Sequence, residues 1–322
     1  MTSELQLSDP LRATISSQSG IVTRSQLHVA GELSDQSIWW RIRSGRWQPV
    51  LPGVYATFTG KLTASQLTVA ASLYGGPDAQ IGGAQALRWH GFRYAPNDPQ
   101  IHLLVPHTRR RRSYGFVVVE RTHRLDCDPK RRGPVAFCGV ARAVADVCRR
   151  SSSLQDARAV VAESVQRGKI TVSALLDELG NGPVRGSALL RRCIAEIAGG
   201  VRSAPEAEAR ELLARSRILP AILWNPRLQA ADGTVLPTPD GWVTTVGIAL
   251  EIDSREYHTS PADWRRTLER HNILARHGVL VLHFTPAQLR TEPATVLDTV
   301  EHAYLERKAA GTLPSVTVTP PS

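Results

Sequence analysis

The sequence predicts a multidomain α+β protein. Its 322 residues exceed what one compact core usually holds, so two or three domains are expected. Signals for three short helices and a hairpin fall within the first 59 residues, and the last third alternates helices with apolar strands in an α/β layout. We therefore expect domains over residues 1–59, 60–200 and 201–310, followed by a disordered tail over residues 311–322.

Composition excludes several classes of protein. No run of about 18 apolar residues occurs, so neither a transmembrane helix nor a membrane partner is expected. Charged residues throughout the first 30 positions exclude a signal-peptide core there. The four cysteines have long, irregular spacings, which predict buried free thiols in a reducing cytoplasm and not a zinc site or disulfides. They are Cys127, Cys138, Cys148 and Cys193.

The net charge of +10 is unevenly distributed along the chain. Residues 1–200 hold 26 Lys and Arg against 15 Asp and Glu, whereas residues 201–322 hold 13 against 14. A basic excess of this kind attracts a polyanion, most often nucleic acid. We therefore expect double-stranded DNA as a partner and a location at the nucleoid.

The first 59 residues predict three helices and a hairpin. The helices are expected over residues 11–17, 24–30 and 35–43, with Ser34 as the N-cap of the third. Two short strands follow within residues 47–56, joined by a Pro52-Gly53 turn. Three helices followed by a small hairpin is the order of a winged helix-turn-helix.

The third helix is the candidate DNA-reading element. Arg41, Arg43 and Arg46 alternate with aromatic residues, a composition that suits phosphate and base-edge contacts in the major groove. Trp39 and Ile42 lie three residues apart and are expected to face the core. The alternative is a core helix whose arginines are only solvated.

The middle region predicts helices and two strands around a basic loop. Four successive arginines, Arg109, Arg110, Arg111 and Arg112, join the strands; they form either a solvated loop or a phosphate clamp. The helices are expected over residues 64–73, 84–90, 140–149, 154–166 and 172–179, and the strands over 99–106 and 115–120.

The C-terminal third predicts a helix that opens at Ser203, where Glu206 completes a capping box. Strands are expected over residues 227–229, 246–253 and 279–284, and helices over 261–277 and 294–308. His271, His277 and His302 are expected at the surface.

Three carboxylates mark the end of the most apolar of these strands. Glu251 and Asp253 alternate along the strand and therefore project from the same face. Asp240 lies about ten residues earlier, at the end of a hairpin partner, where its side chain can reach Glu251. Converging carboxylates repel one another unless a cation is bound or their pKa values rise. The sequence therefore predicts a Mg²⁺ site at Asp240, Glu251 and Asp253.

This set of residues resembles the PD-(D/E)XK nuclease superfamily, and within it the very-short-patch-repair-like domains. The pattern matches Asp240, Glu251-x-Asp253, His258, the helix residues Glu206 and Arg270, and the strand at 279–284, all within residues 201–308. The resemblance implies a restriction-endonuclease-like α/β fold that hydrolyses DNA phosphodiesters. It also implies that His258 or Glu206 assists the water or leaving group, and that Arg270 neutralises phosphate charge.

This sequence departs from that pattern at Ser254, Thr267 and His283, where the family often has Gly, an acidic residue and Arg. Such departures accompany weakened or lost activity. The alternative for His258 is a hydrogen-bonding role at the surface, and Glu206 also completes a capping box, a local role that is compatible with catalysis.

The N-terminal part resembles the winged helix-turn-helix of AbiEi-type antitoxins. The motifs are Gly20-Ile-Val-Thr-Arg-Ser-Gln-Leu27, Val50-Leu-Pro-Gly-Val-Tyr55 and Ala84-Gln-Ala-Leu-Arg-Trp-His-Gly91, within residues 10–95. This resemblance implies a transcriptional repressor of a type IV toxin–antitoxin system, with a toxin as a possible partner. Two functions therefore stay open: a Mg²⁺-dependent DNA endonuclease, and a non-enzymatic regulator that keeps the nuclease fold as a body.

Overall fold

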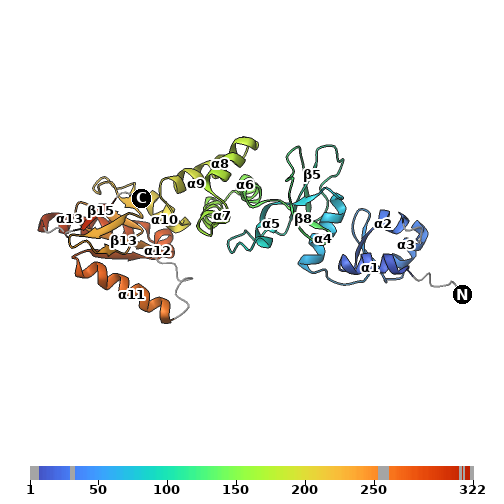
Figure 1. Cartoon of the computed structure of the whole chain (residues 1–322), viewed down its shortest axis with the longest axis horizontal. Helices are drawn as coiled ribbons and strands as arrows, with labels where there is room; N and C mark the ends of the chain where they lie inside the picture. The colour runs from blue at the N-terminus through green and yellow to red at the C-terminus, as the bar shows by residue number, and fades with distance from the viewer. Residues whose placement is uncertain (1–6, 30–32, 253–260, 312–313, 315, 320–322) are drawn as a thin grey trace. The chain divides into compact units, whose positions relative to one another are not determined.

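The computed structural model describes residues 7–29, 33–252, 261–311, 314 and 316–319 (Figure 1). The chain is a mixed α+β protein, as the sequence predicts, with several small sheets. Its internal contacts divide it into two compact units, residues 1–191 (unit 1) and 192–322 (unit 2). Within the described residues, no helix combines the length and apolar character needed to cross a bilayer.

Unit 1 begins with three helices and a three-stranded antiparallel sheet of order β1-β3-β2. Ser34 caps the third helix by accepting a hydrogen bond from the backbone N–H of Ser37, as its sequence position predicts. Pro52-Gly53 turns the hairpin, with Gly53 at a φ of +74° that favours glycine. The elements are α1 (Asp9–Ser17), β1 (Ile21–Thr23), α2 (Arg24–Val29), α3 (Asp35–Arg43), β2 (Gln48–Leu51) and β3 (Val54–Ala56).

The core of this segment corrects one expectation about α3. Ile38 is 3% exposed and packs with Trp47 and Leu27, whereas Trp39 is 55% exposed. Ile38 and Ile42 stand four residues apart, just over one turn, so that pair faces the core together. Trp39 is rotated about 100° away from Ile38 and points to solvent.

The middle of unit 1 holds a five-stranded sheet of order β6-β5-β4-β8-β7 and a group of helices. Its strands are β4 (Gln80–Ile81), β5 (Ile101–Pro106), β6 (Val117–Thr122), β7 (Lys130–Arg132) and β8 (Val135–Phe137). Its helices are α4 (Ala64–Gly75), α5 (Gly83–Trp89), α6 (Val140–Arg150), α7 (Leu154–Gln166), α8 (Val172–Asn181) and α9 (Ala188–Ala198), the last of which contains the boundary between the units.

The connection between β5 and β6 places the arginine loop. The two strands are parallel, with Ile101 opposite Val117 and Pro106 opposite Thr122. A parallel pair cannot be joined by a tight turn, because the chain must return to the end at which the first strand began. Residues 107–116, which contain the four successive arginines, make this return.

Unit 2 contains a four-stranded sheet of order β14-β13-β12-β9 and a smaller one of order β11-β10-β15. Its strands are β9 (Leu223–Trp224), β10 (Arg227–Ala230), β11 (Val235–Leu236), β12 (Gly241–Val243), β13 (Ile248–Ile252), β14 (Leu280–Phe284) and β15 (Val316–Thr319). Its helices are α10 (Ala204–Leu213), α11 (Pro261–Arg276), α12 (Pro286–Thr291) and α13 (Pro293–Ala310).

The central strand β13 is buried on both faces of the four-stranded sheet. Ile248 and Leu250 pack on one side with residues of α10, α12 and α13. Ala249 packs on the other side with Trp242 and with Leu274 of α11, the helix that lies along that face (Figure 1). Since side chains alternate along a strand, Glu251 belongs to the same face as Ala249.

The segment after Gly311 differs from the disordered tail that its composition predicts. Val316–Thr319 forms β15, which pairs antiparallel with β10 so that Leu228 faces Val318. Alternating Val and Thr favour a strand once an open sheet edge is available. The predicted disorder was based on the Pro, Thr and Ser content of this segment. That content does not indicate that β10, far away in the sequence, offers an edge for pairing.

Candidate functional site

The α3 surface combines exposed aromatic rings with arginines. Trp39 and Trp40 are 55% and 49% exposed. The guanidinium of Arg43 lies 4.9 Å from the ring centroid of Trp39, and that of Arg46 lies 5.0 Å from Trp40. Cation–π contacts of this kind hold flexible arginine side chains against the aromatic rings. The exposed surface of α3 therefore presents fixed positive charge beside apolar rings.

Arg41, the third arginine of the predicted DNA-reading set, has a different environment. It is half-buried, with its guanidinium 5.5 Å from the ring of the buried Trp47. Its Nη1 donates a 3.3 Å hydrogen bond to the carbonyl of Ser37, one turn earlier. These contacts make Arg41 a packing residue for the end of α3, while Arg43 and Arg46 form the exposed basic surface.

The arginines of the loop differ in exposure and in their contacts. Arg109 is half-buried, with Nη2 3.8 Å from the carboxylate of Asp78. Arg111 is exposed and lies 5.1 Å from the ring of Tyr74, whose hydroxyl donates a 2.8 Å hydrogen bond to the carbonyl of Arg112. Tyr74 therefore anchors the loop to α4.

The sheet register in unit 2 brings Asp240 opposite Glu251. Gly241 pairs with Leu250 in the antiparallel β12–β13 ladder, so Asp240 and Glu251 occupy the next facing positions. The carboxylate of Asp240 accepts a 2.7 Å hydrogen bond from the backbone N–H of Ile252. Glu251 is 5% exposed, and its Oε1 lies 3.4 Å from Nη2 of Arg270 on α11. Three of the predicted site residues are thus gathered at this end of the sheet.

Two histidines that the sequence did not single out for the site lie beside Glu251. His283 faces Glu251 in the parallel β13–β14 register. Its ring centroid lies 4.1 Å from that of His271 on α11, the helix that also supplies Arg270. The positions Asp240, Glu251 and His283 form a row across three neighbouring strands. This row results from the way the three strands pair. The spacing of the three residues along the sequence does not indicate it.

Glu206 is committed to local contacts at the start of α10. Its Oε1 accepts a 2.9 Å hydrogen bond from the hydroxyl of Ser203, and its Oε2 accepts one of 2.9 Å from the backbone N–H of Arg202. Oε2 also accepts a 2.8 Å bond from Nδ2 of Asn225. These donors favour a capping role over a catalytic one. Asn225 in turn donates its backbone N–H to the carbonyl of Asp240, so Glu206 still supports the site indirectly.

The residues present match the donor chemistry of Mg²⁺. Proteins bind Mg²⁺ through one or two carboxylates together with waters and substrate phosphates. Asp240 and Glu251 supply two carboxylates at one end of the sheet. The other predicted ligand, Asp253, and the predicted catalytic His258 lie outside the described residues.

A second cluster of ionisable groups, in unit 1, was not predicted. His102 Nε2 lies 3.1 Å from Glu120 Oε2, and His102 Nδ1 lies 3.7 Å from Asp146 Oδ2. One ligand atom from each of the three residues falls within 4.8 Å of the others. Arg142 binds both carboxylates, at 2.6 Å to Glu120 and 2.7 Å to Asp146.

Charge balance argues against a cation in this cluster. Its carboxylates, Glu120, Asp146 and Glu178, are matched by Arg124, Arg142 and Arg149. A divalent ion would add positive charge to carboxylates that already have guanidinium partners. We therefore interpret the cluster as an ion-pair network that ties β5 and β6 to α6 and α8.

The pKa values of two carboxyl groups in this network are shifted in opposite directions. The hydrogen bond with His102 lowers the pKa of Glu120, against the smaller effect of burial. Burial raises the pKa of Asp146, although His102 and Arg142 oppose the shift. Both directions follow from the rule that burial disfavours the charged carboxylate and a cationic or donor partner favours it.

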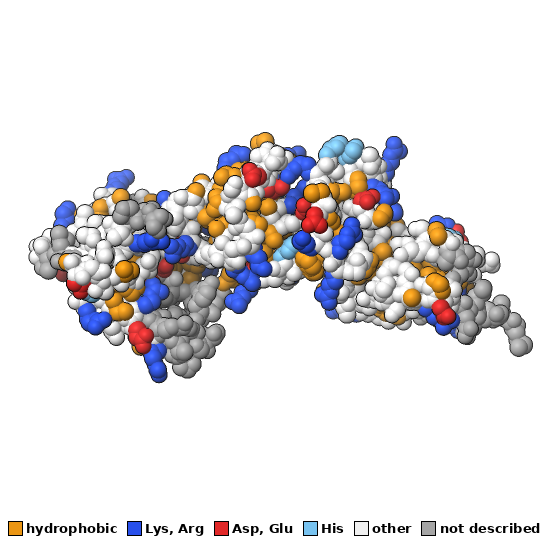
Figure 2. Space-filling model, viewed as in Figure 1, with side chains coloured by type: hydrophobic (Ala, Val, Ile, Leu, Met, Phe, Trp, Pro, Cys, Tyr) orange, Lys and Arg blue, Asp and Glu red, His pale blue; other side chains and the backbone are white. Residues whose placement is uncertain are grey.

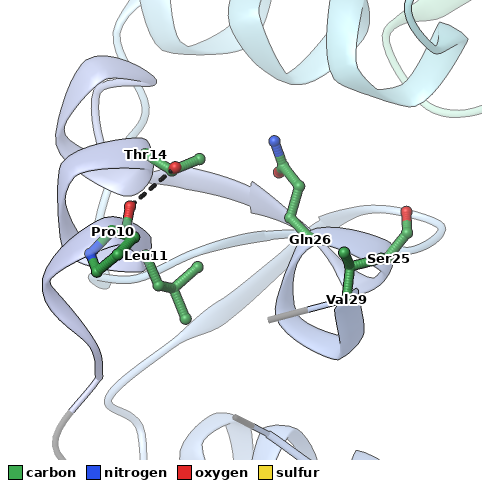
Figure 3. Close-up of a pocket in the computed structure, with 6 residues that line it drawn as sticks. All are labelled: Pro10, Leu11, Thr14, Ser25, Gln26 and Val29. Atoms are coloured by element: carbon green, nitrogen blue, oxygen red, sulfur yellow. Dashed lines mark hydrogen bonds between the residues drawn. The ribbon is translucent and has the colours of Figure 1, made fainter. Parts of the chain in front are cut away.

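A shallow pocket of about 410 Å³ lies between α1 and α2 (Figure 3). Thr14 and Pro10 are linked there by a 3.0 Å hydrogen bond from the Thr14 hydroxyl to the Pro10 carbonyl. The residues that line it are Pro10, Leu11, Thr14, Ser25, Gln26 and Val29, none of which is ionisable. The pocket offers no group for catalysis or metal binding.

Comparison with known proteins leaves the family open. No protein-family model matches the chain, and no curated protein matches it. A crystal structure of the RV2827C protein from Mycobacterium tuberculosis is similar over 58% of this chain and 75% of that chain, with 16% identity and a TM-score of 0.40. That similarity is too low to assign either a fold or a function.

Proposed function

We propose that the chain is a duplex-DNA-binding protein in which residues 9–56 form a winged helix-turn-helix and α3 is the recognition helix. The observation that carries the proposal is the exposed set Trp39, Trp40, Arg43 and Arg46, in which each tryptophan fixes an arginine. Guanidinium groups bind phosphates and the O6/N7 edge of guanine, and apolar rings contact thymine methyl groups. The excess of Lys and Arg over Asp and Glu in residues 1–200 supports the same partner, and Figure 2 shows these basic side chains spread over the visible surface.

The test is a fluorescence-anisotropy titration of the full chain with duplex DNA at several salt concentrations. Arg43→Glu combined with Arg46→Glu should abolish binding, because both phosphate contacts become repulsive. Arg185→Glu combined with Arg217→Glu makes the same charge change at exposed arginines outside α3 and should retain most of the affinity. An unchanged affinity for the α3 variant would refute the proposal.

A second proposed function is Mg²⁺-dependent hydrolysis of DNA by a restriction-endonuclease-like unit 2. The specific support is the row Asp240, Glu251 and His283 beside Arg270. Asp240 and Glu251 would hold the ion, which activates water and stabilises the phosphodiester leaving group when bound. Arg270 would exchange Glu251 for a DNA phosphate and neutralise its charge.

The competing function is a transcriptional regulator that binds DNA without cleaving it, as the antitoxin resemblance implies. The deciding experiment is a plasmid-nicking assay with Mg²⁺ or Mn²⁺ on duplex, single-stranded and mismatched DNA. Cleavage that disappears in Glu251→Ala supports the nuclease. Sequence-specific binding with no cleavage of any substrate supports the regulator.

A further inference from the structure

A groove of about 880 Å³ runs beside α2 within unit 1. One side is formed by α2 and the Pro52-Gly53 turn, and the other by the end of α4, the arginine loop and β7. The groove therefore adjoins the helix that precedes α3, and half of its lining residues lie outside the winged helix-turn-helix.

The lining of this groove is strongly basic. It includes Arg24, His28, Arg109, Arg111 and Arg131, and no Asp or Glu is among its lining residues. Two of the guanidiniums have a carboxylate partner outside the lining: Arg24 is paired with Asp35, and Arg109 lies 3.8 Å from Asp78. Within the part of the chain that the structure describes, Arg111 and Arg131 form no ion pair with a carboxylate. The groove thus keeps positive charge that an anion can neutralise.

The basic groups are fixed by the fold. Arg131 lies in β7, paired with Ala136 of β8. Arg111 is held against Tyr74 at 5.1 Å. The backbone N–H of Arg24 donates a 2.8 Å hydrogen bond to the carbonyl of Gly53, which joins α2 to the hairpin turn. A site whose groups are already positioned loses little conformational entropy on binding.

The same groove is connected to the recognition helix by one carboxylate. Asp35, in the first turn of α3, binds Arg24 and also lies 2.9 Å from Nε2 of His28. The two basic residues of α2 that line the groove are therefore held by α3 itself.

We propose that the groove binds the phosphodiester backbone of the same duplex that α3 reads, on its flank. The proposal rests on the proposed DNA-binding function. It assigns a phosphate-contacting role to Arg111, one of the four loop arginines that the sequence offered as a phosphate clamp, and to Arg131, which the sequence did not indicate. It also divides the loop, because Arg109 and Arg111 line the groove and Arg110 and Arg112 do not.

The experiment compares two double variants with equal charge change. Arg111→Glu with Arg131→Glu reverses two groove residues. Arg110→Glu with Arg132→Glu reverses their neighbours in the same loop and strand, which are equally exposed but lie outside the lining. Duplex affinity of the full chain is measured by anisotropy between low and moderate salt, with the thermal melting temperature checked for each variant.

The groove variant should lose about tenfold or more in affinity, and the slope of log K against log salt should shrink by about 1.8, since each phosphate contact contributes about 0.9. The neighbour variant should keep the wild-type slope. Equal losses of affinity in both variants would show that only net charge matters and would overturn the proposed role of the groove. If the α3 variant still abolished binding in that case, the proposed DNA-binding function would stand.

Two further outcomes also decide the question. Wild-type protein that binds no duplex at low salt refutes the proposed function and the groove together. If the groove variant binds duplex DNA as tightly as the wild type, the proposal is overturned. Binding of inorganic phosphate to the wild type at low millimolar concentration would then identify the groove as a site for small anions.

Discussion

Glu251 and His283 face each other in the register of two parallel strands, although 31 positions separate them in the sequence. The helix that covers them supplies Arg270 to the first and His271 to the second. A buried carboxylate, a guanidinium and an imidazole pair thus meet at one end of the sheet. Glu251 is the buried member of this group, and the guanidinium of Arg270 beside it offsets the cost of burying its charge.

The first prediction concerns this end of the sheet. Glu251→Gln should abolish plasmid nicking in Mg²⁺ while duplex affinity stays within about twofold, because the amide keeps the shape but not the charge of a metal ligand. Glu306→Gln removes a charge from an exposed carboxylate on α13 and should leave both properties unchanged. Nicking that survives in Glu251→Gln would remove this carboxylate from the mechanism.

The second prediction separates the two faces of α3. Trp39→Ala with Trp40→Ala should lower duplex affinity by about fivefold or more, because the rings hold Arg43 and Arg46 in place and each exposed cation–π contact contributes about 0.5–1 kcal/mol. The melting temperature should change little because both rings are about half exposed.

Ile38→Ala provides the comparison for the opposite face. It removes a side chain that is 3% exposed and should lower the free energy of unfolding by about 2–5 kcal/mol. Urea titration and anisotropy on the same preparations distinguish the two effects. A large loss of stability in the double tryptophan variant would instead place those rings in the core.

The third prediction tests the ion-pair network of unit 1. Asp146→Ala leaves the buried guanidinium of Arg142 without one of its two carboxylate partners, and removing one member of a buried pair costs about 3–5 kcal/mol. Urea unfolding should therefore show a large decrease in stability. Asp128→Ala, which removes an exposed carboxylate from the same unit, should stay within about 0.5 kcal/mol of the wild type.

The fourth prediction concerns acid stability. The pKa of Glu120 is lowered in the folded protein, so its ionised form contributes stability above the ordinary Glu value of about 4.3. That contribution should disappear as the pH falls through the lowered pKa. Glu120→Gln lacks it at every pH, so the stability difference between wild type and variant should narrow between about pH 5 and pH 3. A constant difference in urea midpoints across that range would contradict the assignment.

The fifth prediction tests β15. A chain that ends at Pro314 should lose about 4 °C or more in melting temperature, because β10 loses one of its two partner strands. Thr317→Val keeps the strand and should not reproduce the loss. A melting temperature unaffected by the truncation would show that residues 316–319 add nothing to the stability of the sheet.

Local signals predicted much of the secondary structure. Ser34 before a periodic run gave the start of α3, and Pro52-Gly53 gave the hairpin turn. These features depend on residues within one or two turns of each other, where caps and turn geometry dominate. The predicted orientation of Trp39 was wrong, although it also depends on local residues. The i, i+3 pair Trp39 and Ile42 and the i, i+4 pair Ile38 and Ile42 could each face the core, and only packing decides between them.

Features that depend on distant pairing were less accessible. The predicted hairpin relation of Asp240 to Glu251 agrees with the observed register, since both residues lie within one short segment. The place of His283 depends on a parallel crossover, and the network of His102, Glu120 and Asp146 depends on three elements far apart in sequence. The hydrophobic pattern indicates which face of a strand is buried, but it does not indicate which distant strand becomes its partner.

The pairing of β10 with β15 has a consequence for synthesis of the chain. Thr319 faces Arg227, 92 positions earlier. At bacterial and eukaryotic translation rates of about 5–20 residues per second, roughly 5–20 seconds separate the appearance of the two strands. During this interval one edge of β10 has no partner on the nascent chain, and an open strand edge is a template for association with other chains. The yield of folded protein should therefore depend on elongation rate and on chaperones that shield this edge.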